Sequence, residues 1–238
     1  MAQIGRFRFD VGGMPRTIFI TGTDTGAGKT VLTALLARYL RGRGVRVAAL
    51  KPVCSGGRAD ALALRAALGG ALALAEINPW HFRAAVAPAL AARLARRPLR
   101  LAPVLARLRA TRQKYDVTLV EGAGGLLSPL GEDFNSRDLI VALRARPVIV
   151  APDRLGAVNH VLLTLAALPG SCRARARVVL VSPSAPDSAT ASNARLLAQL
   201  FPPSQIFRLP WLGAGFALDD AWRRPRVRRV LQKLLLNS

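Results

Sequence analysis

The sequence GTDTGAGKT, residues 22–30, places glycines, a lysine and a threonine at the spacing of a phosphate-binding loop. Its glycines allow a tight fold in which successive backbone N–H groups point inward and bind an anion. Lys29 would bring a positive charge to the β- and γ-phosphates of a nucleotide, and the Thr30 hydroxyl can ligate Mg²⁺. We therefore predict that a nucleoside triphosphate is bound by Gly26, Ala27, Gly28, Lys29, Thr30 and Val31.

A second group of polar residues follows other predicted strands. Lys51 comes directly after VRVAAL, Glu121 comes directly after DVTLV, and Asp60 lies a few residues beyond Lys51. Because ligands of parallel sheets bind at the carboxyl ends of the strands, we expect these residues beside the loop. Mg²⁺ prefers oxygen ligands, so we predict a magnesium site made of Thr30, Asp60 and Glu121. Asp60 fits equally well as the N-cap of the helix that follows it.

The basic residues separate into two kinds. The 238-residue chain has 35 Lys and Arg against 13 Asp and Glu, a formal net charge of +22. Only four of them are Lys, and the arginines are spread along the chain, most densely at 223–229. We interpret the arginines as a solvated surface, with no specific nucleic-acid or membrane partner. A Lys is the exception here, so we predict that Lys29 and Lys51 are catalytic and neutralise charge during phosphoryl transfer.

Strands alternate with helical segments along most of the chain. This order implies right-handed crossovers and a mostly parallel sheet with helices on both faces, the α/β fold typical of P-loop NTPases. We interpret 77–82 as a turn and 121–125 as a glycine-rich loop. A basic helix at about 225–236 closes the chain, and we expect its removal to leave catalysis largely intact. Short apolar runs predict strands at 17–20, 45–50, 116–120, 147–152, 176–183 and 205–212.

Composition predicts a globular cytoplasmic protein. Hydrophobic residues make up 51% of the chain, which argues against disorder, and no apolar run is long enough to span a bilayer. The N-terminal residues lack the apolar core of a signal peptide, and two cysteines do not make a disulfide framework. We expect a loose leader at 1–15 and a single domain at 16–238, in a reducing cytoplasm.

Six short motifs occur in a fixed order: GTDTGAGKT, KPVCSG, DALAL, EGAGG, LGAVNH and PWL. Together they resemble the dethiobiotin synthetases, the ATP-dependent carboxylases of biotin synthesis, from about Thr17 to about Leu212. The resemblance implies ATP and Mg²⁺, with 7,8-diaminopelargonate and CO₂ as substrates. An amine takes up CO₂ as a carbamate, the carbamate attacks the γ-phosphate, and the second amine closes the cyclic urea with release of ADP and phosphate.

The same resemblance implies roles for individual residues. Lys51 would stabilise the carbamate and the transferred group, and Ser55 would hydrogen-bond the substrate. Asn159 would contribute to the substrate carboxylate site across a homodimer interface. Ser182 stands where the family often has an asparagine that binds the adenine. The positions expected around the nucleotide, besides the phosphate loop, are Asp60, Glu121, Gly122, Ala123, Gly124, Ser182, Pro210, Trp211 and Leu212.

Two other functions stay open at the level of sequence. A partitioning-type P-loop ATPase that binds DNA or membrane would explain the basic charge and the basic C-terminal segment. That group usually has an additional lysine early in the loop, where this chain has Thr23-Asp24-Thr25. An amide-forming ligase on the same scaffold, of the cobyrinate type, would need a glutaminase domain that we do not expect in a chain of this length.

Overall fold

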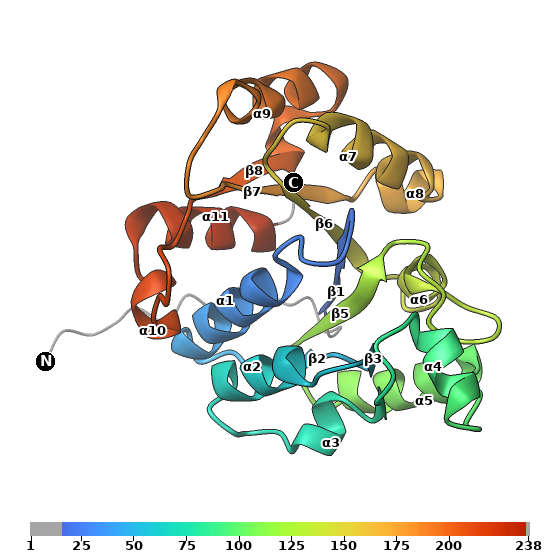
Figure 1. Ribbon diagram of the computed structural model, residues 1–238. Coiled ribbons are helices and arrows are strands. Elements are labelled where there is room, and N and C mark those ends of the chain that lie inside the picture. The colour runs from blue at the N-terminus through green and yellow to red at the C-terminus, as the bar shows by residue number, and fades with distance from the viewer. Residues whose placement is uncertain (1–15, 237–238) are drawn as a thin grey trace, which may run out of the picture.

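A six-stranded parallel sheet forms the centre of the protein, whose structure is a computed structural model that describes residues 16–236. The strand order is β2-β5-β1-β6-β7-β8 (Figure 1), and each neighbouring pair is parallel. The predicted leader at 1–15 lies outside the described residues. The strands are β1 (Arg16–Gly22), β2 (Val47–Leu50), β5 (Val117–Gly125), β6 (Arg146–Pro152), β7 (Arg177–Val181) and β8 (Ile206–Leu209).

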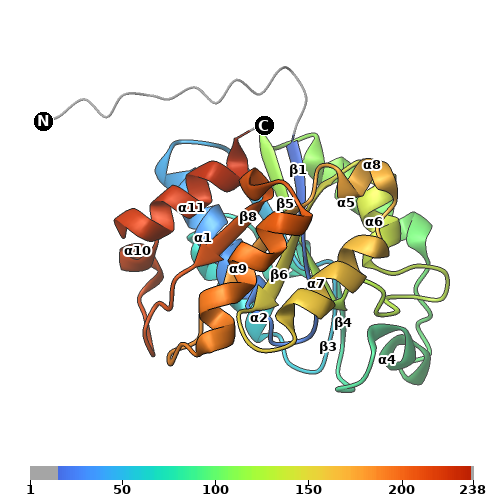
Figure 2. The ribbon, with the colours of Figure 1, turned by 90° about the horizontal axis from the view of Figure 1, so that it is seen from above.

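Helices cover both faces of this sheet, as predicted (Figures 1 and 2). From β1 the chain moves one way to β2, and from β5 onward it moves the other way to β8. Right-handed crossovers therefore place the connecting helices on opposite faces. One face carries α1 (Lys29–Gly42) and α11 (Pro225–Leu235). The other carries α5 (Leu101–Arg112), α6 (Ser136–Ala142), α7 (Ala157–Ala166) and α8 (Gly170–Arg173).

Six further helices complete the fold of residues 16–236. No helix within residues 16–236 is long and apolar enough to cross a membrane. These elements are α2 (Ala59–Ala67), α3 (Leu74–Ile77), α4 (Pro88–Leu94), α9 (Ser188–Leu200), the 3-10 helix η1 (Pro203–Gln205) and α10 (Leu218–Ala221).

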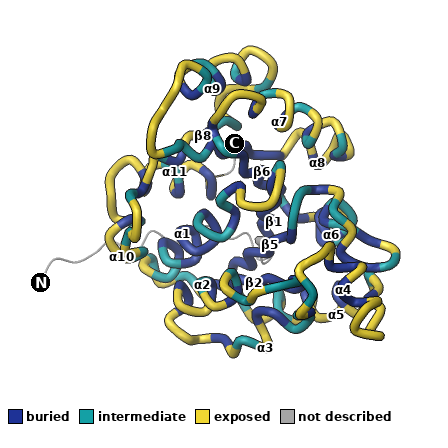
Figure 3. Tube along the Cα trace, viewed as in Figure 1, coloured by how far each residue is buried: buried dark blue, intermediate teal, exposed yellow. Residues whose placement is uncertain are grey.

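The core lies between the sheet and its helices (Figure 3). The apolar run of β1 is fully buried, and so is the predicted face of α1, including Leu32 and Leu35. The basic helix α11 also belongs to this core, because Val227, Leu231 and Leu234 are buried. This packing argues against our expectation that the helix is dispensable, since its removal would expose core side chains.

Three local predictions are corrected by backbone pairing. Residues 77–82 are not only a turn, because β4 (Trp80–Phe82) pairs with β3 (Val53–Ser55) in a small parallel sheet. The glycines at 122–125 do not form a separate loop but continue β5. The last strand, β8, ends at Leu209, so the PWL motif follows it as irregular chain.

The close packing of α6 and β1 against β5 requires a glycine at position 122. A Cβ atom there would lie 2.6 Å from Ser136 Oγ and 3.1 Å from the ring of Phe19. Ser136 is the first residue of α6 and Phe19 belongs to β1, so the glycine lets this helix approach the sheet closely.

Replacing Gly122 with alanine should destabilise the protein by overpacking. We expect Gly122→Ala to lower the free energy of unfolding by about 1–3 kcal/mol. Chemical denaturation measures this change. The control is Gly170→Ala, because a Cβ at Gly170 meets no atom within 4 Å. Equal stability of the two variants would contradict the packing argument.

Candidate functional site

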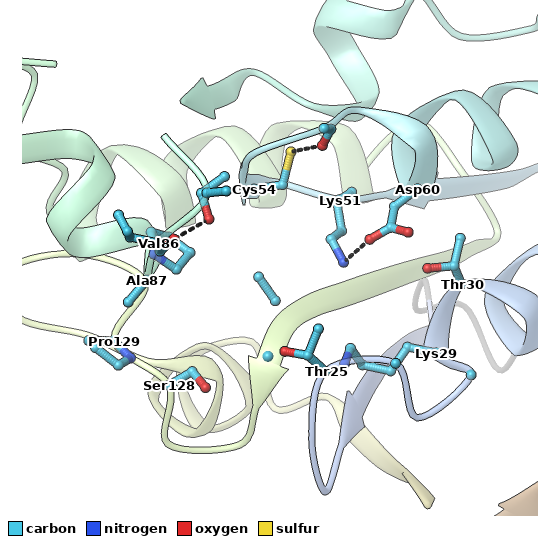
Figure 4. A pocket seen from close by; sticks show the side chains of 18 of the residues that line it. Thr25, Lys29, Thr30, Lys51, Cys54, Asp60, Val86, Ala87, Ser128 and Pro129 are labelled. Atoms are coloured by element: carbon cyan, nitrogen blue, oxygen red, sulfur yellow. Dashed lines mark hydrogen bonds and ion pairs between the residues drawn. The ribbon is translucent and has the colours of Figure 1, made fainter. Parts of the chain in front are cut away.

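A cavity of about 800 Å³ opens at the carboxyl ends of β1, β2 and β5 (Figure 4). Of the predicted site residues, it is lined by Gly26, Gly28, Lys29, Thr30, Val31, Lys51, Ser55, Asp60, Ala123 and Gly124. The predicted residues outside its lining are Ala27, Glu121, Gly122, Asn159, Ser182, Pro210, Trp211 and Leu212.

The phosphate loop has the backbone shape that its glycines predicted. Gly28 has φ of 95° and is the N-cap of α1, a left-handed conformation that favours glycine. Lys29 begins the helix, is buried, and donates a hydrogen bond from Nζ to the carbonyl oxygen of Asp24 at 2.8 Å. The positive end of the α1 dipole therefore lies at the loop, as a phosphate site requires.

Four polar side chains meet just beyond the end of β2, beside β5. The buried ammonium of Lys51 donates to Glu121 Oε1 at 2.7 Å and to the carbonyl of Gly122 at 3.0 Å. Its distance to Asp60 Oδ2 is 2.9 Å, and Figure 4 shows these two side chains pointing toward each other. The Thr30 hydroxyl donates to the same Glu121 oxygen at 2.8 Å. The cluster thus joins the phosphate loop to two neighbouring strands.

Burial and neighbouring charges shift the pKa values of Lys29 and Lys51 in opposite directions. Burial by itself lowers the pKa of Lys51, but Glu121 and Asp60 outweigh it and raise that pKa above its ordinary value. Burial, with the nearby charge of Lys51, lowers the pKa of Lys29 to about 8. Lys51 is therefore held as a cation, whereas Lys29 loses its proton as the pH rises through about 8 unless a further anion binds beside it.

The carboxylates of the cluster retain oxygens for another ligand. Glu121 is fully buried, and its Oε2 has no hydrogen-bond partner within the described chain. The Asp60 side chain is 47% exposed. The N-cap of α2 is Arg58, with Asp60 two residues further on, so the alternative role of Asp60 as the helix cap is wrong.

Asn78 is a structural support of the site that the sequence analysis missed. It is buried, and its Nδ2 donates to the backbone carbonyl of Lys51 at 2.7 Å. Its Oδ1 lies 3.3 Å from both Cys54 Sγ and Arg58 Nε. One side chain therefore fixes the turn that carries Lys51. A polar residue just before a proline in an otherwise apolar stretch is the signal that could have identified it.

An apolar wall forms the far side of the cavity. Val86, Ala87 and Pro88 lie there, with Pro129 beside them. Ser55 donates a hydrogen bond to the carbonyl of Val86 at 2.5 Å, so this predicted substrate residue also positions the wall. Such a surface fits an aliphatic chain attached to the polar group that faces Lys51.

Ser182 and the PWL motif lie on the other side of the phosphate loop. The backbone N–H of Ser182 donates to the carbonyl of Leu209 at 2.9 Å, which places the ends of β7 and β8 together. Val181, the last residue of β7, lies against Gly28, where an added Cβ would approach it to 3.2 Å. Residues 210–212 thus leave the sheet at the same edge as the loop, away from Lys51.

Asn159 does not line the cavity that contains Lys51 and Ser55. It is exposed on α7, in a separate hollow of about 600 Å³ between α7 and α9. Leu155 and Leu196 line the same hollow and are 82% and 45% exposed. The structure therefore does not bring Asn159 together with Lys51 and Ser55 within one chain.

The fold and the loop define a P-loop α/β protein. The profile of a family described as "AAA domain" matches residues 16–214. The ATP-dependent dethiobiotin synthetase BioD of Anaeromyxobacter sp. (strain Fw109-5) is 44% identical over 157 residues, or 64% of this chain and 70% of that protein. The enzyme of the same name from Anaeromyxobacter dehalogenans (strain 2CP-C) is 40% identical over 201 residues, covering 82% and 90%.

The chain belongs to the dethiobiotin synthetase family, as the order of its motifs indicated. Among solved structures, hydrogenase maturation factor HypB from Archaeoglobus fulgidus aligns with a TM-score of 0.47 at 18% identity, over 91% of this chain and 90% of that one. The assignment rests on the sequence relatives and not on that likeness.

Proton uptake should accompany the binding of ADP in the absence of metal. A bound phosphate favours the charged form of Lys29, whose pKa in the free protein is about 8. ADP binding should therefore weaken as the pH rises through 8, and near pH 8 about half a proton should be taken up per ADP. Calorimetry with excess chelator, in buffers of different ionisation enthalpy, measures this uptake. Lys29→Arg should bind ADP without it, and unchanged uptake in that variant would refute the assignment.

Proposed function

We propose that this chain is an ATP-dependent dethiobiotin synthetase, an enzyme of the cyclo-ligase type. It would convert 7,8-diaminopelargonate and CO₂ to dethiobiotin and release ADP and phosphate. The observation that carries the proposal is the buried Lys51 ammonium, which faces the cavity between two carboxylates and the phosphate loop. The relative from Anaeromyxobacter dehalogenans supports it, because it carries that name and is 40% identical over a stretch that covers 90% of its own length.

The substrates supply the nucleophiles in this reaction. One amine of the diamine adds to CO₂ and loses a proton, which gives a carbamate. A carbamate oxygen attacks the γ-phosphorus, the bond to the bridging oxygen breaks, and ADP leaves. The second amine then attacks the carbonyl carbon of the mixed anhydride, and phosphate leaves as the urea ring closes. The protein need only position these groups and stabilise charge, which is what two fixed ammonium groups do.

Lys51 and Lys29 have different tasks in this proposal. Lys51 keeps its charge because two carboxylates raise its pKa against the effect of burial, so it can stabilise the carbamate and the transferred phosphoryl group. Lys29 holds the β- and γ-phosphates from the loop side. Ser55 hydrogen-bonds the substrate, whose aliphatic chain lies along Val86 and Pro129.

The cluster fits Mg²⁺, which we propose is held by Thr30, Asp60 and Glu121. The unpartnered Oε2 of Glu121 and the half-exposed carboxylate of Asp60 are hard oxygen donors. No group of three His, Cys, Asp or Glu side chains within 16–236 could hold a metal. Magnesium needs few protein ligands, because phosphate and water complete its shell. When bound, it would neutralise charge on the triphosphate.

The nucleotide would extend from Lys51 across the loop toward β7 and β8. Its phosphates would contact the backbone of the loop and of Ala123 and Gly124, which line the cavity. Its base would lie beside Ser182 and the PWL motif, because these follow the strands on the far side of Gly28. This direction agrees with ligand binding at the carboxyl edge of a parallel sheet.

A homodimer would explain the position of Asn159. The exposed Leu155, just before α7, and the exposed Leu196 of α9 lie around it and form an apolar surface of the kind that contacts another chain. In the dimer, Asn159 would reach the substrate carboxylate in the partner's cavity. A cytoplasmic location and the lack of a specific nucleic-acid partner stay predictions, for which the two free, buried cysteines and the dispersed arginines are the support.

A coupled assay tests the proposed function. The purified protein is incubated with diaminopelargonate, bicarbonate and Mg·ATP, and both phosphate release and product mass are measured. Dethiobiotin should form with one phosphate per product, and phosphate release without that product would refute the function. Lys51→Ala should bind ADP normally but turn over about 10²–10³ times more slowly. Lys114→Ala, which removes an exposed lysine, is the control and should match the wild type.

A further inference from the structure

The segment from Pro210 to Phe216 connects β8 to α10, and its Leu212 and Phe216 side chains pack against the hydrophobic core. It has no regular secondary structure, and Gly213 and Gly215 have φ of 91° and 63°. The side chain of Leu212 is buried, whereas Trp211 is 51% exposed. An irregular segment with two glycines has many accessible conformations, so its position depends on a small number of anchors.

One arginine donates a hydrogen bond to the backbone of this segment. Arg224 Nη1 donates to the carbonyl oxygen of Leu212 at 2.7 Å. Within the described part of the chain, residues 210–216 make no other hydrogen bond. The position of the backbone at Leu212 is therefore set by its buried side chain and by the guanidinium of Arg224.

Arg224 itself lies at the start of α11, which packs against the core. It is the N-cap residue of α11, and its backbone N–H donates to the carbonyl of Ala221 at 3.2 Å. The preceding Trp222 packs edge to face on Tyr39 of α1, with ring centroids 6.1 Å apart. Figure 1 shows α10 and α11 beside α1, the helix that begins at the phosphate loop.

We propose that Arg224 is a positioning residue for nucleotide binding. By fixing the Leu212 carbonyl, it holds the segment that flanks the base at a set distance from the phosphate loop. This inference rests on the proposed function, which places the base beside Ser182 and residues 210–212. Arg224 is not among the residues that line the cavity at the phosphate loop, so its effect should be confined to the base end of the nucleotide.

Two probes separate this role from a general structural one. Mg·ADP occupies both the phosphate loop and the base position, whereas inorganic tripolyphosphate occupies the loop alone. Arg224→Met removes the donor and keeps most of the apolar stem, and no side-chain cap of α11 is lost, since Arg224 makes none. The control is Arg226→Ala, which removes an exposed arginine from the same helix.

Calorimetry should show Mg·ADP binding about 10-fold more weakly to Arg224→Met, as expected for the loss of a charged donor. Tripolyphosphate affinity, kcat and the thermal midpoint should stay at the wild-type values, and KM for ATP should rise with the ADP dissociation constant. Arg226→Ala should behave as wild type in every measurement. Equal weakening of both probes, or unchanged ADP affinity, would overturn the inference.

A third variant distinguishes failure of this inference from failure of the proposed base position. Trp211→Ala should also weaken Mg·ADP and spare tripolyphosphate. If only Trp211→Ala weakens ADP, the base position stands and the role of Arg224 is wrong. If neither variant does, the base does not bind along residues 210–212, and the inference fails together with that part of the proposed function.

Discussion

The site depends on a buried ammonium group that must be paired. Lys51 is 3% exposed, and an isolated charge at that depth would cost far more free energy than the fold can supply. Glu121 at 2.7 Å and Asp60 at 2.9 Å provide the counter-charges. Lys51 directly follows β2 and Glu121 lies within β5, so the ion pair forms because these two strands are neighbours in the sheet. The pairing that stabilises the lysine therefore also directs its charge toward the phosphate loop.

Helix α1 connects the phosphate loop to the C-terminal segment that carries Arg224. Its first residue, Lys29, lies in the phosphate loop, and near its other end Gly42 and Tyr39 contact Trp222. The Arg38 guanidinium adds an ion pair to Asp219, with Nη2 and Oδ2 2.9 Å apart. These contacts connect the basic C-terminal segment to the nucleotide site, and part of that segment is core. The basic helix α11 therefore has a structural role in addition to contributing positive charge to the surface.

Local patterns predicted the parts of the site that lie close together in sequence. The apolar run, glycines and lysine of residues 17–30 dictate strand, loop and helix, and strand ends located Lys51 and Glu121. The β3–β4 pair could not be predicted, because three-residue strands carry too little periodicity. Asn78 was missed because its role is a contact to a backbone carbonyl 27 residues earlier. The buried face of α11, by contrast, can be read from the sequence, because Val227, Leu231 and Leu234 recur at the spacing of one helix face.

The central claim is that Glu121 binds Lys51 and Thr30 through Oε1 and keeps Oε2 for a divalent ion. Mn²⁺ can replace Mg²⁺ as a paramagnetic probe, and electron paramagnetic resonance measures its binding in the presence of ADP. Glu121→Gln keeps an oxygen for Lys51 but removes the charge. The account predicts that Mn²⁺ binds at least about 10-fold more weakly to this variant, whereas metal-free ADP still binds at pH 7. Wild-type affinity for Mn²⁺ in Glu121→Gln would contradict it.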